Sequence, residues 1–290
     1  MKNNDYRLKG HESFILRDGW LTKGLRAVSA DAKVFSNNSG ADALGVGTNM
    51  AKAIRYWLRA AGLINTTPKG VMLTELGQLI FEKDPFFEDM FSLWLVHVNI
   101  ARNSGQATSW NVFFNDISVS TFNRKELASM MTESIRATYD FQPPERSVAD
   151  DCSAILQMYS DNEDNNEDRD PEEKKKSPFA TLGLLKQIEN GQFEKTRPAI
   201  NEIDPLIILY LISDRLAEEK ILQIDTVVSA NDMAGKILNL SRVAINDYLD
   251  ILQNAGYITV NRTAGLDVIY PDNLISPIEV VNKHYEGSNA

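Results

Sequence analysis

The sequence predicts a mainly α-helical protein with small β wings, in which two winged helix-turn-helix modules flank a helical middle region. The first observation behind this prediction is an internal repeat: residues 44–64 align without a gap with residues 238–258, 194 positions later. The second is that apolar residues recur in both copies at three- and four-residue steps, the spacing of one helix face. The identical pairs are Leu44/Leu238, Leu58/Leu252, Ala61/Ala255, Gly62/Gly256 and Ile64/Ile258.

The first module is expected over residues 10–83. A short helix ends near Leu44, and the turn 45–47 uses glycines, which tolerate a left-handed backbone. Thr48 is expected to cap the next helix, and Gly62 to end it. A hairpin with its wing at 65–70 and a helix over 74–81 follow. The apolar face of the second helix is predicted to comprise Met50, Ile54, Trp57, Leu58 and Ala61, and its remaining surface Asn49, Lys52, Ala53, Arg55, Tyr56 and Arg59.

The middle region is expected over residues 84–160. It contains two strongly apolar helical stretches, whose aromatic residues we interpret as core. His97 lies within one of these stretches and is interpreted as a hydrogen-bonded core histidine. Residues 161–178 combine eight acidic residues with few apolar ones, a composition that cannot offset the entropy cost of ordering, so we expect an acidic flexible loop.

The second module is expected over residues 200–285, entered by a helix that follows Pro205. Asn239 suits the left-handed turn, and Ser241 is expected to cap the helix that corresponds to the second helix of the first module. That helix carries Asp247 and Asp250, opposed only by Arg242. We therefore favour protein contact or homodimerisation for this module. Its candidate contact residues are Ser241, Arg242, Asn246 and Arg262.

The charge of the chain is unevenly distributed. The 290 residues carry a formal net charge of −10, yet residues 1–70 hold 11 Lys and Arg against five Asp and Glu. A basic end on an acidic body predicts one surface that faces nucleic acid. The residues expected to contact DNA are Lys23, Thr48, Asn49, Lys52, Arg55, Arg59 and Lys69. Winged helices also serve as protein-docking modules, so a role without DNA remains open.

Other features restrict the location and the chemistry. Cys152 is the single cysteine, so neither an intramolecular disulfide nor a cysteine-based zinc site is expected. Aspartates on its N-terminal side make it a poor thiolate, and we expect a small buried residue.

No signal peptide is evident, and the longest apolar run, 206–212, is too short to span a bilayer, so we expect a cytoplasmic protein without membrane contact. The sequence has no P-loop motif for ATP hydrolysis.

A block of residues before the first helix-turn-helix carries a family resemblance. Residues 10–24 read Gly-His-Glu-Ser-Phe-Ile-Leu-Arg-Asp-Gly-Trp-Leu-Thr-Lys-Gly. Together with Leu44–Met50, Ile54–Trp57, Thr74–Gly77, Leu93–His97, Thr108–Trp110, Phe113–Phe114 and Leu182–Leu185, this block resembles the DUF4007 family of bacterial proteins. The resemblance covers roughly residues 10–215 and implies an SspB-type component of a DNA phosphorothioation system in antiviral defence. It also implies three partner proteins: a cysteine desulfurase, an ATPase and a sulfurtransferase-like subunit.

The same block holds the candidate catalytic residues. DNA nicking is attributed to the SspB-type component, and His11, Glu12 and Asp18 could serve as a general base or as metal ligands, with Mg²⁺ or Mn²⁺ as the cofactor of a nickase. No compact nuclease spacing accompanies them. A buried polar network of His11, Glu12 and Arg17 that fixes the N-terminal segment is the alternative. Three functions therefore stay open: a DNA-binding component, a metal-dependent nicking endonuclease, and a winged-helix regulator or scaffold without catalysis.

Overall fold

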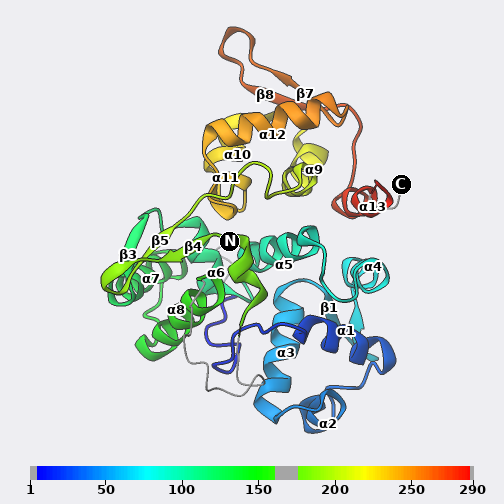
Figure 1. The fold of residues 1–290 in the computed structure, drawn as a ribbon, viewed down its shortest axis with the longest axis vertical. Coiled ribbons are helices and arrows are strands. Elements are labelled where there is room, and N and C mark those ends of the chain that lie inside the picture. Colours follow the sequence, from blue (N-terminus) through cyan, green and yellow to red (C-terminus); the bar gives the residue numbers. More distant parts are fainter. Residues whose placement is uncertain (1–4, 161–175, 288–290) are drawn as a thin grey trace. The chain divides into compact units, whose positions relative to one another are not determined.

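Contacts between residues divide the chain into two units, Met1–Thr196 and Arg197–Ala290. The computed structural model describes residues 5–160 and 176–287, so the predicted acidic loop of residues 161–178 lies outside the described residues except for its last three. The model is mainly helical with small antiparallel sheets, and the predicted fold class is confirmed at that level (Figure 1). Unit 1 contains the predicted first module and middle region, and unit 2 contains the predicted second module.

The first part of unit 1 follows the order helix, turn, helix, hairpin. Helix α3 packs against α1, and α2 lies at the N-terminal end of α3 (Figure 1). Strands β1 and β2 pair antiparallel, with Ile64 opposite Leu73. The elements are α1 (Trp20–Ala30), η1 (Asn38–Gly40), α2 (Ala41–Leu44), α3 (Thr48–Ala60), β1 (Ile64–Thr67), β2 (Gly70–Leu73) and α4 (Glu75–Lys83).

The rest of unit 1 is a helical layer with a three-stranded sheet in the order β3-β5-β4. Asn123 begins α7 with a capping box, because its side chain accepts from the backbone of Glu126 while the Glu126 carboxylate accepts from Asn123 N–H. The elements are α5 (Met90–Arg102), α6 (Thr108–Asn115), β3 (Thr121–Asn123), α7 (Arg124–Tyr139), α8 (Glu145–Tyr159), η3 (Pro178–Leu182), β4 (Leu185–Gln187), η4 (Glu189–Gly191) and β5 (Gln192–Lys195).

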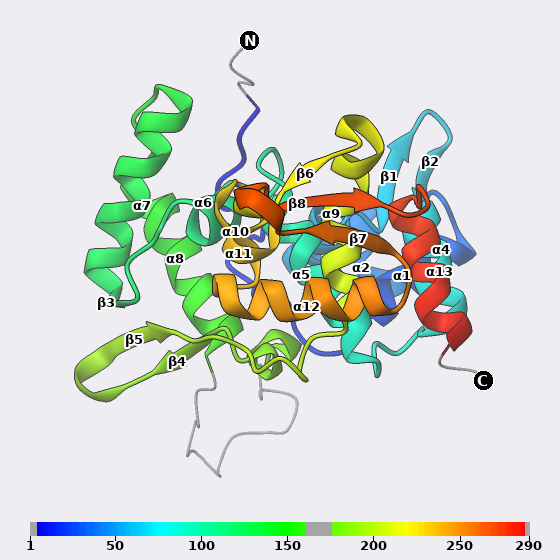
Figure 2. The ribbon, with the colours of Figure 1, turned by 90° about the horizontal axis from the view of Figure 1, so that it is seen from above.

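Unit 2 repeats the helix-turn-helix-hairpin order and adds a third strand to the hairpin. Figure 2 shows β8 between β6 and β7. The entry helix of unit 2, α9, begins at Pro205, where the sequence predicts a helix to start. Helix α13 packs against α9. The elements are α9 (Pro205–Glu219), β6 (Leu222–Gln223), α10 (Ile224–Ser229), α11 (Ala234–Ile237), α12 (Arg242–Asn254), β7 (Ile258–Asn261), η5 (Thr263–Gly265), β8 (Val268–Pro271) and α13 (Pro277–Gly287).

The aromatic residues of the middle region form its core, as the sequence predicts. Trp94, Trp110 and Phe113 are buried, whereas Phe86 is more than half exposed. His97 is buried too, and its Nδ1 lies 2.9 Å from the Tyr159 hydroxyl, so it is the predicted hydrogen-bonded core histidine. Cys152 is also buried, and burial, with the nearby Asp151 carboxylate, raises the pKa of its thiol.

The two turns behave as the repeat predicts, but one cap does not. Gly45 (φ 61°) and Asn239 (φ 51°) both adopt the left-handed conformation, and the Ser241 hydroxyl accepts from the backbone N–H of Ala244. The prediction that Thr48 caps α3 is wrong. Thr48 is already the first helical residue, one position too late to cap, and its hydroxyl donates to Asn38 instead.

The predicted surface of α3 also needs a correction. Ala53 and Tyr56 are buried, not exposed. Tyr56 is covered by the segment N-terminal to α1, where Gly10 and Arg7 lie against its ring. Across the described residues, none of the helices combines the length and apolar character that crossing a lipid bilayer demands.

Gly77 allows α4 to pack against the end of the first helix-turn-helix. A Cβ atom at this position would lie 2.0 Å from the carbonyl oxygen of Leu63. We expect Gly77→Ala to lower the free energy of unfolding by about 1–3 kcal/mol because the backbone must shift. Gly105→Ala is the matched control, since the nearest atom to its Cβ would be 3.7 Å away. Urea unfolding followed by circular dichroism measures both, and equal losses would contradict this packing role.

Candidate nucleic-acid interface

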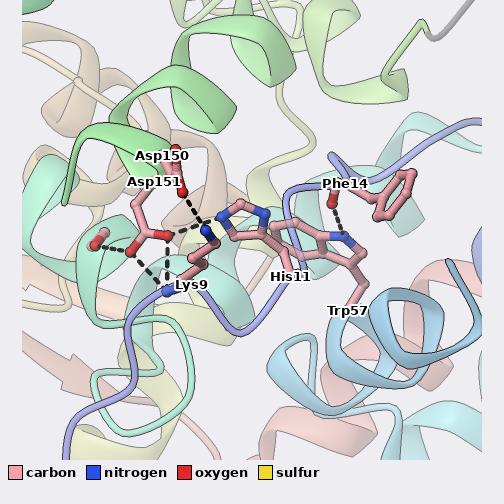
Figure 3. A network of polar contacts seen from close by, with 7 residues as sticks. Lys9, His11, Phe14, Trp57, Asp150 and Asp151 are labelled. Carbon is pink, nitrogen blue, oxygen red and sulfur yellow. Dashed lines mark hydrogen bonds and ion pairs between the residues drawn. The ribbon is translucent and has the colours of Figure 1, made fainter. Parts of the chain in front are cut away.

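A buried carboxylate on α8 holds the segment that precedes α1, residues 5–19. Asp151 is 1% exposed. Its oxygens accept the backbone N–H of Lys9 at 3.0 and 3.2 Å and the hydroxyl of Ser109 at 2.5 Å. His11 Nε2 lies 2.9 Å from the same carboxylate (Figure 3). The segment is therefore fixed to α8 and α6 by a carboxylate whose oxygens are fully engaged.

His11 belongs to the interior of this network. A carboxylate only accepts hydrogen bonds, so Nε2 of His11 carries the hydrogen. Nδ1 is buried and has no hydrogen-bond partner among the described residues. The ring stacks on Trp57 at 6.0 Å between centroids and meets the edge of Trp110 at 5.7 Å. Figure 3 shows His11 beside Trp57, with Asp151 on its other side. In this conformation the imidazole has no contact with solvent and acts as an anchor.

A second set of contacts binds the segment to α3. The indole N–H of Trp57 donates to the carbonyl of Phe14 at 3.1 Å (Figure 3). Gly10 passes so close to the ring of Tyr56 that a Cβ atom there would lie 2.3 Å from it. The Arg7 guanidinium lies over the same ring, 5.2 Å from its centroid. The backbone N–H of Arg7 donates to Thr108 at 2.8 Å. Arg7 is thereby positioned beside α3.

The segment, η1 and α3 together line an open basic pocket of about 230 Å³. We call it the basic pocket; it is lined by Arg7, Gly10, Glu12, Ser39, Lys52, Arg55, Tyr56 and Arg59. Four of these residues are cations and one is an acid. Within the described part of the chain, no ion pair joins Arg7, Lys52, Arg55 or Arg59 to a carboxylate. The pocket therefore carries an excess of positive charge.

The cations of the basic pocket repel one another. Partial burial lowers the pKa of Arg55, and the charges of Arg59 and Arg7 lower it further. Each cation thus disfavours the charged form of its neighbours, although arginine stays protonated at neutral pH. An anion in the pocket relieves this repulsion.

The predicted DNA-contacting residues fall into two groups. Lys52, Arg55 and Arg59 line the basic pocket, while Thr48 and Asn49 begin the same helix and are exposed. Lys52 Nζ donates to Asn49 Oδ1 at 3.3 Å. Lys23 on α1 and Lys69 in the β1–β2 turn are also exposed, but neither of them lines the pocket. Sequence reasoning missed Arg7 and Tyr56 as pocket residues.

The predicted catalytic residues lie in different environments. His11 is buried, Glu12 is exposed and lines the basic pocket, and Asp18 is exposed beside α1, where its carboxylate accepts the backbone N–H of Gly19. Arg17 does not join the His11 network; its guanidinium lies over the rings of Phe14 and Trp20. Over residues 5–160 and 176–287, no three His, Cys, Asp or Glu residues lie close enough together to hold a metal ion.

The second module uses its cations differently. Arg242 pairs with Asp225 and Asp267, and Arg262 pairs with Asp250 at 2.7 Å. The hydrogen bond and charge of Asp225 raise the pKa of Arg242. The positions that correspond to Lys52, Arg55 and Arg59 across the repeat are Asn246, Leu249 and Gln253. The predicted contact residues of this module are therefore engaged within unit 2.

The Asp151 network gives a direct test. Asp151→Ala should lower the free energy of unfolding by about 3–5 kcal/mol, because it leaves His11, Ser109 and the Lys9 N–H buried without an acceptor. Asp150→Ala is the control: its ion pair with Lys9 is about one-third exposed at both ends, so its loss should cost less than about 1 kcal/mol. Urea unfolding measures both, and similar losses would mean that the buried carboxylate has no special role.

Comparisons with known proteins identify the fold. A solved structure described as "SspB crystal structure" matches with a TM-score of 0.84 and 22% identity, over 99% of this chain and 91% of that one. A second, described as "Magnesium ion-bound SspB crystal structure", matches with a TM-score of 0.83 and 23% identity, over 98% and 89%. At this identity the likeness establishes a shared fold. No curated protein matches the sequence.

The family itself is established from the sequence. The family model "Protein of unknown function (DUF4007)" matches residues 8–285, which includes the Gly-His-Glu segment, both helix-turn-helix copies and the middle region. This confirms the family predicted from the residue motifs, and it extends the match through the second module. The chain belongs to the DUF4007 family.

Proposed function

We propose that this protein is the DNA-binding component of a bacterial phosphorothioation-based, antiviral DNA modification system. The observation that carries the proposal is the basic pocket, with four cations and no ion pair to a carboxylate in the described chain. Phosphate groups are the anions that DNA presents, and they provide most of the binding affinity of such surfaces. Family membership and the fold shared with SspB structures support the assignment to a phosphorothioation system.

We interpret residues 41–73 as a winged helix. The order α2, turn, α3, β1, β2 is the order of that motif, in which the second helix enters the major groove and the hairpin touches the backbone. In this arrangement Thr48, Asn49 and Lys52 face the duplex from the start of α3. Arg55 and Arg59 continue the same basic surface toward Arg7. Lys69 reaches a phosphate from the wing, and Lys23 adds a backbone contact.

We further propose that unit 2 contacts protein. Arg242 and Arg262, the cations predicted to make its contacts, are neutralised by neighbouring aspartates, so they are less available to bind phosphate. On α12, Val243 is 71% exposed and Ile251 43%, at positions that share a helix face with Asp247. Two exposed apolar side chains on this face suit a contact with a second copy of the chain or with a partner of the modification system, such as the cysteine desulfurase, the ATPase or the sulfurtransferase-like subunit.

The nicking endonuclease remains the second candidate. One SspB structure is described as magnesium-bound, but the described residues here do not gather a set of metal ligands. Glu12, the one carboxylate of the basic pocket, lies among four cations, a surrounding that disfavours a bare divalent ion. Relaxation of supercoiled plasmid in Mg²⁺ or Mn²⁺ that Glu12→Ala abolishes would establish the endonuclease.

The DNA-binding proposal predicts a salt-dependent loss. Lys52→Ala/Arg55→Ala should weaken binding to a duplex roughly tenfold or more. It should also reduce the slope of log K against log salt by about two, because two phosphate contacts disappear. Fluorescence anisotropy over a salt series measures both quantities.

Two variants serve as controls in that assay. Lys125→Ala/Lys186→Ala removes two exposed cations elsewhere in unit 1, and Arg242→Ala/Arg262→Ala removes the paired cations of unit 2. Both should keep the wild-type slope. A regulator that binds through unit 2 would lose affinity in the second control, and a scaffold without DNA contact would show no salt-dependent binding in any variant.

A further inference from the structure

We propose that the basic pocket receives a phosphomonoester at the end of a DNA strand, such as the 5′-phosphate at a nick. This inference rests on the proposed DNA-binding function and specifies the chemical group that the pocket selects. The pocket walls come from three parts of unit 1: the segment before α1, Ser39 in η1, and α3. Three of the cations lie on α3, and Arg7 adds a fourth from the segment before α1, so positive charge reaches the pocket from two elements.

The size of the pocket limits its occupant. Sites for drug-sized ligands occupy about 300–1,000 Å³, and the basic pocket measures about 230 Å³. That space accommodates a phosphate group with its attached sugar, and no length of duplex. A strand can reach into it only where the strand ends or leaves the helix. Internal phosphates of a bound duplex can contact the exposed parts of Lys52, Arg55 and Arg59, whereas a terminal group can enter the space between α3 and Arg7.

The charge of the pocket sets the chemistry of the terminal group. An internal phosphodiester carries one negative charge, whereas a phosphomonoester carries about −1.5 to −2 at neutral pH and three terminal acceptor oxygens. Four cations and one carboxylate line the pocket. Arginine forks bind phosphate oxygens in pairs, and Arg7 and Arg55 supply such forks from two elements, the segment before α1 and α3. The surplus positive charge matches a dianion better than a monoanion.

The backbone beside the pocket adopts unusual conformations. Lys9, Glu12 and Ser13 all have positive φ, at 54°, 52° and 66°. Non-glycine residues adopt this region at a cost, and surrounding contacts must maintain it. Those contacts are the buried Asp151 network on one side and the Trp57–Phe14 hydrogen bond on the other. They keep Arg7 and Glu12 at the pocket before any ligand arrives.

Binding to nicked duplexes tests the inference. The probes are a short duplex with a central nick that carries a 5′-phosphate, the same nick with a 5′-hydroxyl, and the intact duplex. We expect the 5′-phosphate probe to bind roughly tenfold more tightly than the 5′-hydroxyl probe. Arg7→Ala should abolish this preference while Lys125→Ala preserves it. Glu12→Gln should strengthen it, because the substitution removes a like charge beside the phosphate.

Each other outcome has a definite meaning. Equal binding of both nicked probes, or a preference that survives Arg7→Ala, overturns the inference. If all three duplexes bind equally and with the wild-type salt slope, DNA binding stands and only the end recognition fails. If none of them binds, the proposed function fails. Deoxyadenosine monophosphate serves as a competitor, and its displacement of a probe that shows no strand-end preference would assign the pocket to free nucleotides instead.

Discussion

The buried carboxylate of Asp151 is the interaction on which the candidate site depends. A charge in the protein interior is tolerated only when donors surround it, and three donors do so here: a backbone N–H, a hydroxyl and an imidazole N–H. All three come from outside α8. Because the carboxylate needs these donors, it holds the segment before α1 against α8. This placement brings Arg7 to the basic pocket.

The two copies of the repeat show how one local fold can serve two chemistries. Both have the same turn geometry and the same glycine after the second helix. They differ in what the surface residues do. In the first copy, three cations on α3 meet no carboxylate partner in the described chain, whereas the arginines of the second copy are bound by neighbouring aspartates. The charge pairing, and not the fold, separates the proposed DNA-facing module from the proposed protein-facing module.

Local features were predictable from the sequence, and long-range ones were not. The left-handed turns at Gly45 and Asn239 and the Ser241 cap depend on neighbouring residues, so the sequence pattern is sufficient for them. The Thr48 cap failed by one position, which is the usual uncertainty of a helix boundary. The burial of Tyr56 could not be foreseen, because it results from a segment that Asp151 holds from about 140 positions away. Arg7 was missed for the same reason: its role depends on where Asp151 places the segment, and no sequence motif marks it.

A double-mutant cycle on DNA binding tests the central claim that the Asp151 network assembles the basic pocket. Asp151→Asn, Arg7→Ala and the double variant are compared at a temperature where circular dichroism shows all three to be folded. We expect Asp151→Asn to weaken DNA binding although Asp151 touches no DNA. Arg7→Ala should then have little further effect, because Arg7 has already lost its position. Wild-type affinity in folded Asp151→Asn, or losses that simply add, would show that the Asp151 network does not assemble the basic pocket.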